Sequence, residues 1–421
     1  MSGYHPLTVE RVPDYLAAIP AMKPRLAGAG RLDCAEVGDG NLNLVFTVRR
    51  GENGPGVAVV KQALPYLRCA GEGWPLGRQR MLFESKALQI EGELCPGLVP
   101  ELIHFDEPMS LVVMEYLDSH RIMRKGLIEG VKYPKFAEHM ATFLARSLFL
   151  TSDLYLPTAE KKAQVAYFAR NTELCKITED FVFTNPFMES PDNRHNPRID
   201  AQVQALRADA RLKIEIAALK DGFLARTQAL VHGDLHTGSV MLNLADTRVI
   251  DPEFAFYGPM GFDVGALLGN LVLAYCSHEI HSRDEAARRD YQGWLIDTIR
   301  HVWNGFYDQF MQLWRTENKG EATRPEFFAA CGGQAALDLY RRRYLLGVLQ
   351  DSVGYGGCKM MRRQLGIAHV EDIESIKDPA DRAVAESMAL AIGQRFITER
   401  AQVQGIDDMI DIVRTTRRPT A

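Results

Sequence analysis

The chain has 421 residues, of which 46% are hydrophobic and 24% are charged, and its formal net charge is −5. That length is enough for two lobes with separate cores, and the dispersed charge excludes the basic stripe expected of a nucleic-acid partner. The seven cysteines occur singly, which is typical of a reduced compartment. The N-terminus lacks an apolar signal core and no run is expected to be long enough to span a bilayer, so we expect a cytoplasmic protein without a membrane partner.

A turn rich in glycine and asparagine separates two strand-like runs near the N-terminus. It contains Gly38, Gly40, Asn41 and Asn43. The backbone N–H groups of such a turn can approach phosphate oxygens closely. The same pattern also fits an ordinary hairpin turn. It is not a Gly-x-x-x-x-Gly-Lys-Ser/Thr loop, which disfavours a P-loop fold.

The next elements are an apolar strand over residues 56–62, which carries Lys61 near its end, and a helix over residues 80–88. Glu84 on that helix is the best-placed partner for the lysine. A strand lysine held in this way can reach the phosphates of a nucleotide. The alternative is a strand-end lysine whose ammonium reaches solvent.

The chain then changes from short apolar runs to longer periodic ones. Residues 69–78 form a glycine-rich loop around Trp74, which is either a functional loop or a surface turn with a packed tryptophan. Residues 110–117 predict a buried strand that runs into a polar bend. Beyond residue 118 helical periodicity dominates, as in residues 136–150 and 340–350. The first part is therefore expected to be mostly β with one clear helix, and the second mainly helical.

The most informative segment follows an apolar run that ends at Val231. It is a short polar loop with an isolated carboxylate, Asp234, and a second apolar run then leads to Asp251 and Glu253. Phosphoryl transfer needs one carboxylate to orient a hydroxyl and accept its proton, and others to hold magnesium against phosphates. In an extended segment Asp251 and Glu253 share one face and can bind the same ion.

Other interpretations of this segment are weaker. It could be a pair of strands with polar ends. A metal hydrolase built on His232, Asp234 and His236 lacks the helical His-Glu-x-x-His spacing, and no Gly-x-Ser-x-Gly elbow supports a serine hydrolase. Further along, Asp263 is expected to hold the polar loop through backbone N–H groups.

Two arginine clusters compete for the substrate. The cluster at residues 341–343 is expected at the start of a helix, where a charge run usually forms a solvated face. Arg362 and Arg363 lie between apolar residues, and their forked donors suit sugar hydroxyls and a transferring phosphoryl group. We favour the second pair, and expect His369 nearby to be structural.

The order of these motifs, together with the runs 251–263 and 361–370, resembles the protein-kinase-like superfamily that contains aminoglycoside and choline kinases. Within it, the chain is similar to the methylthioribose kinases over most of its length. The resemblance implies an α+β, two-lobed protein-kinase-like fold, with a small β-rich N-terminal lobe over 1–117 and a larger, mainly helical lobe over 118–421. Ser239 stands where an asparagine usually binds a second metal ion, and Glu253 is the expected replacement.

The same resemblance implies ATP- and Mg²⁺-dependent phosphorylation of the anomeric hydroxyl of 5-methylthioribose, which gives 5-methylthioribose 1-phosphate in methionine salvage. Asp234 is the expected catalytic residue and contacts the sugar together with Arg362 and Arg363. The residues expected to bind ATP are Gly38, Gly40, Asn41, Asn43, Lys61, Glu84, the hinge residues Glu115, Tyr116 and Leu117, and Asp251, Pro252 and Glu253, with Asp251 and Glu253 also holding the metal ion.

Alternative functions and partners stay open at this point. A choline, homoserine or aminoglycoside kinase is the first alternative, although the arginine pair would repel a cationic substrate. A non-catalytic kinase-like binding module is the second, although the strand lysine and the loop carboxylate are both present. The expected partner is a small sugar, without nucleic acid, and the resemblance also implies a possible homodimer.

Overall fold

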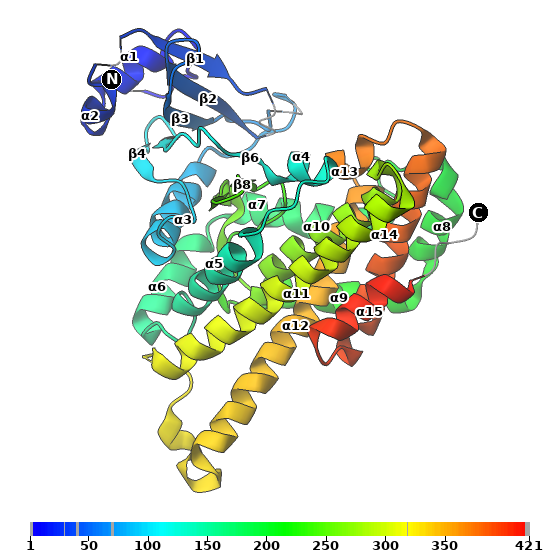
Figure 1. Ribbon diagram of the computed structural model, residues 1–421. Helices are drawn as coiled ribbons and strands as arrows, with labels where there is room; N and C mark the ends of the chain where they lie inside the picture. The colour runs from blue at the N-terminus through cyan, green and yellow to red at the C-terminus, as the bar shows by residue number, and fades with distance from the viewer. Residues whose placement is uncertain (1–2, 29, 39–41, 69–70, 318, 417–421) are drawn as a thin grey trace.

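The computed structural model describes residues 3–28, 30–38, 42–68, 71–317 and 319–416. Two of the predicted ATP-binding residues, Gly40 and Asn41, therefore lie outside the described residues. The described chain forms a small sheet-containing part, blue to cyan in Figure 1, and a larger part that is mainly helical. This arrangement confirms the predicted fold class.

The small part is built on a five-stranded antiparallel sheet with the order β1-β2-β3-β5-β4. Its strands are β1 (Leu32–Glu36), β2 (Asn43–Arg50), β3 (Gly56–Ala63), β4 (Leu102–Asp106) and β5 (Leu111–Met114). The predicted helix after β3 is α3 (Arg80–Leu94), which leads to β4. Three short helical segments precede the sheet: α1 (Val12–Ala18), η1 (Pro20–Met22) and α2 (Lys23–Leu26).

The one clear helix expected in this part is α3, and the short segments α1 and α2 are helical as well. Both are too short to show a helical period in the sequence. Helix α1 is stabilised by packing, since Val12 and Leu16 are buried in the same cluster as Phe46 and Val60 of the sheet. The predicted strand over residues 110–117 is also shorter than expected and ends at Met114.

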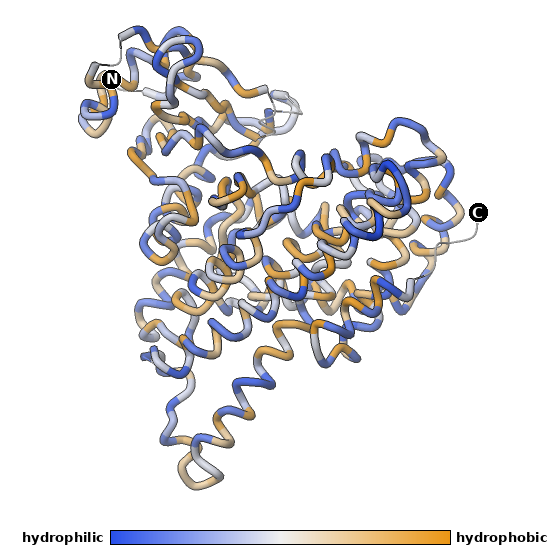
Figure 2. Tube along the Cα trace, viewed as in Figure 1, coloured by the Kyte–Doolittle hydropathy of each residue, from blue (hydrophilic) through white to orange (hydrophobic). Residues whose placement is uncertain are grey.

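The larger part contains the helices α4 (Met123–Ile128), α5 (Phe136–Leu150), α6 (Thr158–Phe168), α7 (Thr172–Phe181), α8 (Asp200–Ala208), α9 (Ala210–Ala225), α10 (Met260–His281), α11 (Glu285–Thr316), α12 (Gly333–Leu365), α13 (Glu371–Glu374), α14 (Pro379–Glu399) and α15 (Ile406–Thr415). The predicted helix over residues 136–150 is α5, and residues 340–350 lie within α12. Figure 2 shows hydrophilic and hydrophobic residues alternating along α11 and the first half of α12, as expected of helices with one buried face.

Short strands and 3₁₀ turns connect these helices. The strands are β6 (Arg121–Ile122), β7 (Ala229–Val231), β8 (Val240–Leu242), β9 (Thr247–Val249) and β10 (Phe256–Gly258), and the turns are η2 (Asn185–Phe187), η3 (Pro197–Ile199), η4 (Pro252–Phe254), η5 (Pro325–Cys331) and η6 (Arg400–Gln402). Strand β7 pairs with β10, and β8 pairs with both β6 and β9. The predicted polar loop and metal segment lie between these strands.

Helices α10 and α12 cross at unusually close range, because glycines line the contact. A Cβ on Gly265 would lie 2.3 Å from the carbonyl oxygen of Ser352, and one on Gly269 would lie 2.8 Å from that of Gly356. Helix α10 also corrects the expectation that no run could span a bilayer. Its 22 residues are long and apolar enough to cross a membrane by length and composition alone. However, 94% of the most apolar stretch of this helix is buried inside the protein.

The cluster at residues 341–343 lies within α12 rather than at its start. Arg342 and Arg343 are exposed, as predicted for a solvated face. Arg341 is buried instead, and its guanidinium donates to Asp338 at 2.9 Å and to the carbonyl oxygen of Trp314 at 3.1 Å. The prediction was therefore wrong for Arg341, because the helix begins earlier and turns this side chain inward.

Candidate active site

The polar loop that follows β7 is held by backbone contacts. Asp263 on α10 accepts the N–H groups of His232 at 2.6 Å and Gly233 at 3.0 Å, which confirms the role predicted for this carboxylate. Gly233 has φ 83°, and a Cβ there would lie 2.2 Å from the carbonyl oxygen of Phe254. Only glycine fits this position, so the loop presents Asp234 in one fixed place.

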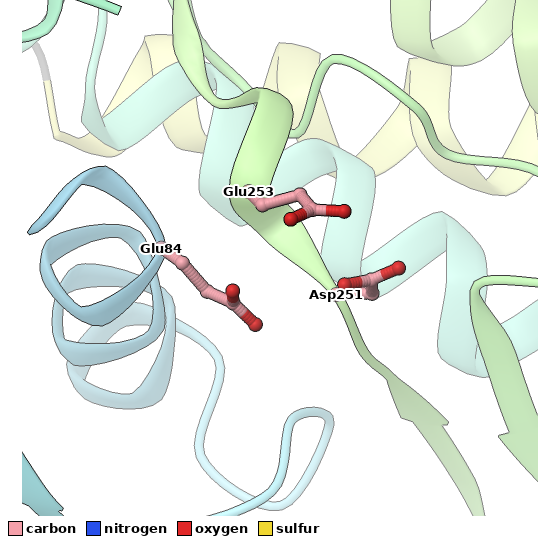
Figure 3. Close-up of side chains that lie close together, drawn as sticks. All are labelled: Glu84, Asp251 and Glu253. Atoms are coloured by element: carbon pink, nitrogen blue, oxygen red, sulfur yellow. The ribbon is translucent and has the colours of Figure 1, made fainter. Parts of the chain in front are cut away.

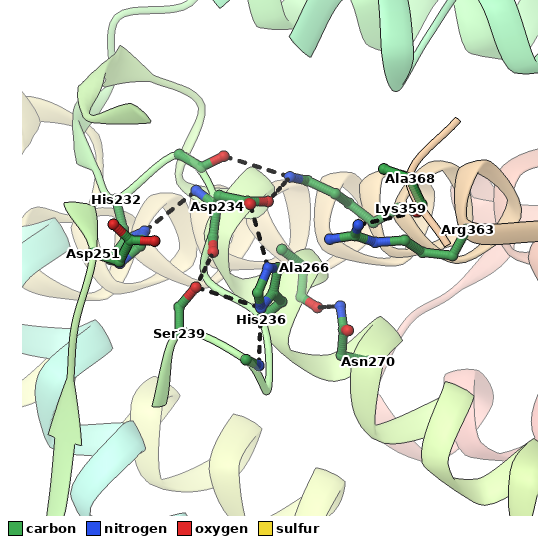
Figure 4. A network of polar contacts seen from close by, with 12 residues as sticks. His232, Asp234, His236, Ser239, Asp251, Ala266, Asn270, Lys359, Arg363 and Ala368 are labelled. Carbon is green, nitrogen blue, oxygen red and sulfur yellow. Dashed lines mark hydrogen bonds and ion pairs between the residues drawn. The ribbon is translucent and has the colours of Figure 1, made fainter. Parts of the chain in front are cut away.

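Asp234 lies among basic side chains, as Figure 4 shows. Its Oδ1 is 2.8 Å from Nζ of Lys359 and 3.6 Å from a terminal nitrogen of Arg362, and its Oδ2 is 3.3 Å from Nε2 of His236. Burial opposes ionisation, but Lys359, His236 and Arg362 outweigh it and hold the pKa of Asp234 well below its usual range. The carboxylate is therefore an anion that is positioned by several donors.

The tautomer of His236 follows from its hydrogen bonds. Its Nδ1 accepts the backbone N–H of Gly238 at 2.9 Å, so the ring proton is on Nε2 and is donated to Asp234. Burial lowers the pKa of His236 to about 4, although Asp234 opposes this. The imidazole is therefore neutral near pH 7 and orients Asp234 without adding charge.

The metal segment differs from the extended geometry predicted for it. Asp251 adopts a left-handed conformation with φ 69° and ψ 48°, and Pro252 then begins the 3₁₀ turn η4. The carboxylates nevertheless converge, because ligand oxygens of Glu84, Asp251 and Glu253 all lie within 4.8 Å of one another. Figure 3 shows Glu84 reaching from α3 toward the other two side chains. Such a set of hard oxygen donors suits Mg²⁺.

Lys61 lies at the centre of these carboxylates. Its Nζ is 2.9 Å from Glu84 and 3.8 Å from Glu253, and it also contacts Asp251 directly. The predicted contact between Lys61 and Glu84 is present, and the alternative of a solvent-reaching lysine is excluded because Lys61 is buried. Burial disfavours the ammonium, but the carboxylates of Asp251, Glu253 and Glu84 outweigh it and raise the pKa of Lys61.

Glu253 connects the metal segment to the glycine-rich turn. Its Oε2 accepts the Nδ2–H of Asn43 at 2.7 Å, so the Asn43 side chain is directed at this carboxylate. Arg80, which sequence reasoning missed, donates to Asn43 Oδ1 at 3.0 Å and to the carbonyl oxygens of Leu42 at 3.1 Å and Gly77 at 2.8 Å. No local signal marks Arg80, since its partners come from separate segments. Gly38 lies in the turn that follows β1.

The predicted hinge begins where β5 ends. The N–H of Glu115 donates to the carbonyl oxygen of Glu101 at 2.9 Å. This donor is therefore not free to bind an adenine, contrary to the prediction. Among the described residues, the carbonyl oxygen of Glu115 and the N–H of Leu117 have no partner. The guanidinium carbon of Arg49 lies over the ring of Tyr116, 4.6 Å from the ring centroid. Part of the predicted backbone set therefore remains available.

Arg362 and Arg363 are both buried at the end of α12. Arg363 donates to the carbonyl oxygen of Ala368 at 3.1 Å, and burial lowers its pKa. Lys359 was missed by the sequence analysis. It lies three residues before Arg362 and four before Arg363, a spacing that places the three side chains on one face of a helix. Arg124 was also missed; its Nε lies 2.7 Å from the buried Asp372.

A positioned loop carboxylate, a strand lysine and converging carboxylates are the parts of a phosphoryl-transfer site. The chain belongs to the phosphotransferase enzyme family, because the sequence model of that family matches residues 33–300. Methylthioribose kinase 1 of Oryza sativa subsp. japonica is 46% identical over 97% of this chain and 95% of its own length. The methylthioribose kinase of Escherichia coli O45:K1 is 41% identical over 97% of both chains. Within the family, the chain therefore belongs to the methylthioribose kinases.

Further relatives agree in length. The methylthioribose kinase of Geobacillus thermodenitrificans is 41% identical over 99% of this chain and 98% of its own. A solved glucosamine kinase in complex with glucosamine, ADP and inorganic phosphate is more distant, with 14% identity and a TM-score of 0.47 over 91% of this chain and 86% of that one.

Proposed function

We propose that the protein transfers the γ-phosphoryl group of ATP to the anomeric hydroxyl of 5-methylthioribose. The observation that carries this proposal is the position of Asp234, which lies on the loop held by Asp263 and faces Lys359 and Arg362. The identity of the sugar is supported by full-length likeness to methylthioribose kinases. The product would be 5-methylthioribose 1-phosphate, as required for methionine salvage.

In this mechanism Asp234 binds the substrate hydroxyl and accepts its proton. Its depressed pKa makes it a weak base, so most of its effect comes from orientation. A loose phosphoryl-transfer transition state tolerates a weak base, because the nucleophile needs little activation. Arg362 and Arg363 would contact the sugar and the transferring group with fixed guanidinium donors.

Asp251 and Glu253 would hold the metal ion. Mg²⁺ supplies charge neutralisation for the phosphates when it is bound. Lys61, held by Glu84, would bind the phosphates beneath the turn that contains Gly38 and Asn43. The carbonyl oxygen of Glu115 and the N–H of Leu117 would pair with the adenine edge, beside Tyr116. Pro252 would contribute by starting the η4 turn between the metal ligands.

We further propose that residues 1–117 act as the nucleotide-binding lobe and residues 118–421 as the catalytic and substrate-binding lobe. The boundary lies just after β5, where the proposed hinge begins. A cytoplasmic location is supported by the cysteines, since the six found among the described residues are all free. No sequence or structural feature of the described residues requires nucleic acid as a partner.

A homodimer is a further part of the proposal. The η5 turn and the first part of α12 project from the body at the bottom of Figure 1. There, Phe327 is 81% exposed and Leu339 is 63% exposed, which is costly for a monomer in water. Sedimentation equilibrium should show a dimer for the wild type and a monomer for Phe327→Glu. A monomeric wild type would contradict this part of the proposal.

The proposed reaction can be tested by ADP release with a panel of acceptors. We expect turnover with 5-methylthioribose and little with choline, homoserine or an aminoglycoside. A cationic acceptor would be repelled by Lys359, Arg362 and Arg363, which together outnumber Asp234 in charge. Preferential turnover of choline or an aminoglycoside would overturn the choice of substrate. Absence of turnover with every acceptor would favour a binding module.

A further inference from the structure

Lys359 is a buried lysine that points directly at the proposed catalytic carboxylate (Figure 4). Its Nζ lies 2.8 Å from Oδ1 of Asp234 and 3.4 Å from the carbonyl oxygen of Gly233. The same ammonium lies 4.6 Å from the ring centroid of Phe262 on α10. Only 3% of the side chain is exposed. The ammonium is therefore fixed by contacts with the catalytic loop on one side and an aromatic face on the other.

These contacts make the two oxygens of Asp234 different from each other. Oδ1 is bonded to the ammonium of Lys359, with Arg362 at 3.6 Å. Within the part of the chain that the structure describes, Oδ2 has one side-chain contact, the longer one of 3.3 Å with the neutral His236. A carboxylate oxygen can accept more than one hydrogen bond, and Oδ2 has the greater remaining capacity. The geometry thus reserves Oδ2 for an incoming hydroxyl.

We propose that Lys359 is a positioning residue for phosphoryl transfer, an inference that rests on the proposed function. Lys359 holds Asp234 through Oδ1 and so presents Oδ2 to the hydroxyl of the substrate. Without this bond the carboxylate could rotate about its terminal torsion, which has broad minima. A misaligned carboxylate binds the hydroxyl less often in the reactive geometry, and turnover falls even when substrate still binds.

The charges around Lys359 make the contact dependent on pH. Asp234 on the loop and Asp263 on α10 face it, as do Arg362 and Arg363 from its own helix, while the neutral His236 lies beyond Asp234. Burial and the guanidiniums lower the pKa of Lys359 to about 8, although Asp234 opposes this. The ammonium is thus present near neutral pH and is lost in mildly alkaline solution.

The first test is Lys359→Met, which keeps a similar length but removes the charge. We expect kcat to fall about ten- to a hundredfold, as for a lost hydrogen bond to a charged group. The KM for ATP should change by less than about threefold, because Lys359 contacts Asp234, Gly233 and Phe262 and none of the nucleotide ligands among the described residues. A purely structural loss would instead lower the amount of folded enzyme without changing the kcat of the folded fraction.

Two further variants give measurements that a loss of folded protein alone would not change. Lys359→Arg keeps its charge at all accessible pH values. The wild type should lose kcat/KM above about pH 8 as the ammonium deprotonates, and in the arginine variant this alkaline limb should move upward. Lys359→Ala should regain turnover with added methylammonium in a concentration-dependent way. Tetramethylammonium has no N–H donor and should not restore it.

Lys161→Met is the matched control. Lys161 is equally buried and donates to Asp153 at 2.7 Å and to the carbonyl oxygens of Thr227 at 2.8 Å and Gln228 at 2.9 Å. Its ammonium also faces an aromatic ring, that of Tyr257 at 4.8 Å. Its replacement should lower thermal stability like that of Lys359 but leave kcat and the alkaline limb unchanged.

Asp234→Asn separates failure of this inference from failure of the proposed function. If Asp234→Asn keeps wild-type turnover, the proposed role of the carboxylate fails. If Asp234→Asn is inactive while Lys359→Met has wild-type kcat, the role of Lys359 is overturned and the function stands. If Lys359→Met does not fold, the alkaline limb of Lys359→Arg and the amine response of Lys359→Ala decide, and absence of both effects overturns the inference.

Discussion

At the scale of single residues, Asp234 combines a fixed position with weak basicity. Its donors stabilise the anion, and the same donors make the carboxylate reluctant to take a proton. For a reaction with a loose transition state this is a workable compromise, since orientation contributes more than basicity. Removing the negative charge at unchanged shape tests how much it contributes.

Asp234→Asn should therefore lower kcat by about 10²- to 10⁴-fold, the range found when a general base is lost. Affinity for ATP should change little, because the nucleotide ligands proposed above come from other segments. Steady-state ADP release and equilibrium binding of an ATP analogue measure the two effects separately. Activity within a few-fold of the wild type would contradict the role given to Asp234.

Glu253 allows a similar separation of charge from hydrogen bonding. Glu253→Gln keeps an acceptor for Asn43 but removes the carboxylate, so it should raise the Mg²⁺ concentration needed for half-maximal rate. Asn43→Ala removes the hydrogen bond and keeps the charge, and should change the Mg²⁺ requirement less. Asp251→Asn should be more severe than either variant. An unchanged magnesium titration for Glu253→Gln would contradict its role as a metal ligand.

The residues that could be predicted share a local sequence context. Lys61 and Glu84 follow from a strand and the next helix, and Asp234 and Asp251 from polar positions directly after apolar runs. Lys359 could not be placed in this way, because 125 residues separate it from Asp234 and only the crossing of α12 over α10 joins them. The arginine cluster shows the same limit, since the inward turn of Arg341 depends on where α12 begins.

At the scale of secondary-structure elements, the glycine-lined crossing of α10 and α12 determines the site. Helix α10 carries Asp263, which holds the loop, and α12 carries Lys359 and Arg362. The two helices must therefore keep a fixed separation for these side chains to meet at Asp234. Sequence periodicity predicts that the helices exist but contains no information on how closely they approach.

Gly265→Ala should force α10 and α12 apart, because the new methyl group would lie 2.3 Å from a backbone carbonyl oxygen. We expect a loss of roughly 1–3 kcal/mol in the free energy of unfolding, as for other overpacked contacts, together with a lower kcat. Gly347→Ala on α12, the other helix of the crossing, is the control, since nothing lies within 4 Å of its added Cβ. It should be neutral or slightly stabilising, because alanine favours helix. Denaturant unfolding checks both variants.

The end of α12 gives a second prediction at this scale. Arg362→Ala and Arg363→Ala should each lower kcat/KM for 5-methylthioribose about ten- to a hundredfold, the effect of losing a charged donor. Binding of ATP should persist. Arg342→Ala is the appropriate control because Arg342 is exposed, whereas Arg341 is buried and would destabilise the helix when removed. A large loss from Arg342→Ala with silent Arg362 and Arg363 variants would place the sugar elsewhere.

At the scale of the whole molecule, two neutral histidines, the partly buried His236 and the buried His278, connect stability to pH. Burial lowers the pKa of both His236 and His278 to about 4, below the usual value of 6.5. Between these values the unfolded chain binds protons that the folded protein does not, so the free energy of unfolding falls as pH decreases from about 6.5 toward 4.

We expect a loss of about 2 kcal/mol for each histidine between pH 7 and pH 5. His278 donates to the carbonyl oxygen of Leu127 at 2.7 Å and has no contact with Asp234, so His278→Gln tests stability without disturbing the site. Denaturant unfolding at pH 7 and pH 5 should show a smaller loss for this variant than for the wild type. An equal loss would show that His278 is not responsible.

The placement of Lys61 among Glu84, Asp251 and Glu253 has a consequence for the order of binding. In the free enzyme the carboxylates that suit a divalent ion already have a counter-charge of their own. An ion that arrives alone must compete with this covalently tethered ammonium and is expected to bind weakly. A nucleotide gives Lys61 new phosphate partners and so frees the carboxylates for the ion. We therefore expect the ion and the nucleotide to bind together, each increasing the affinity of the enzyme for the other.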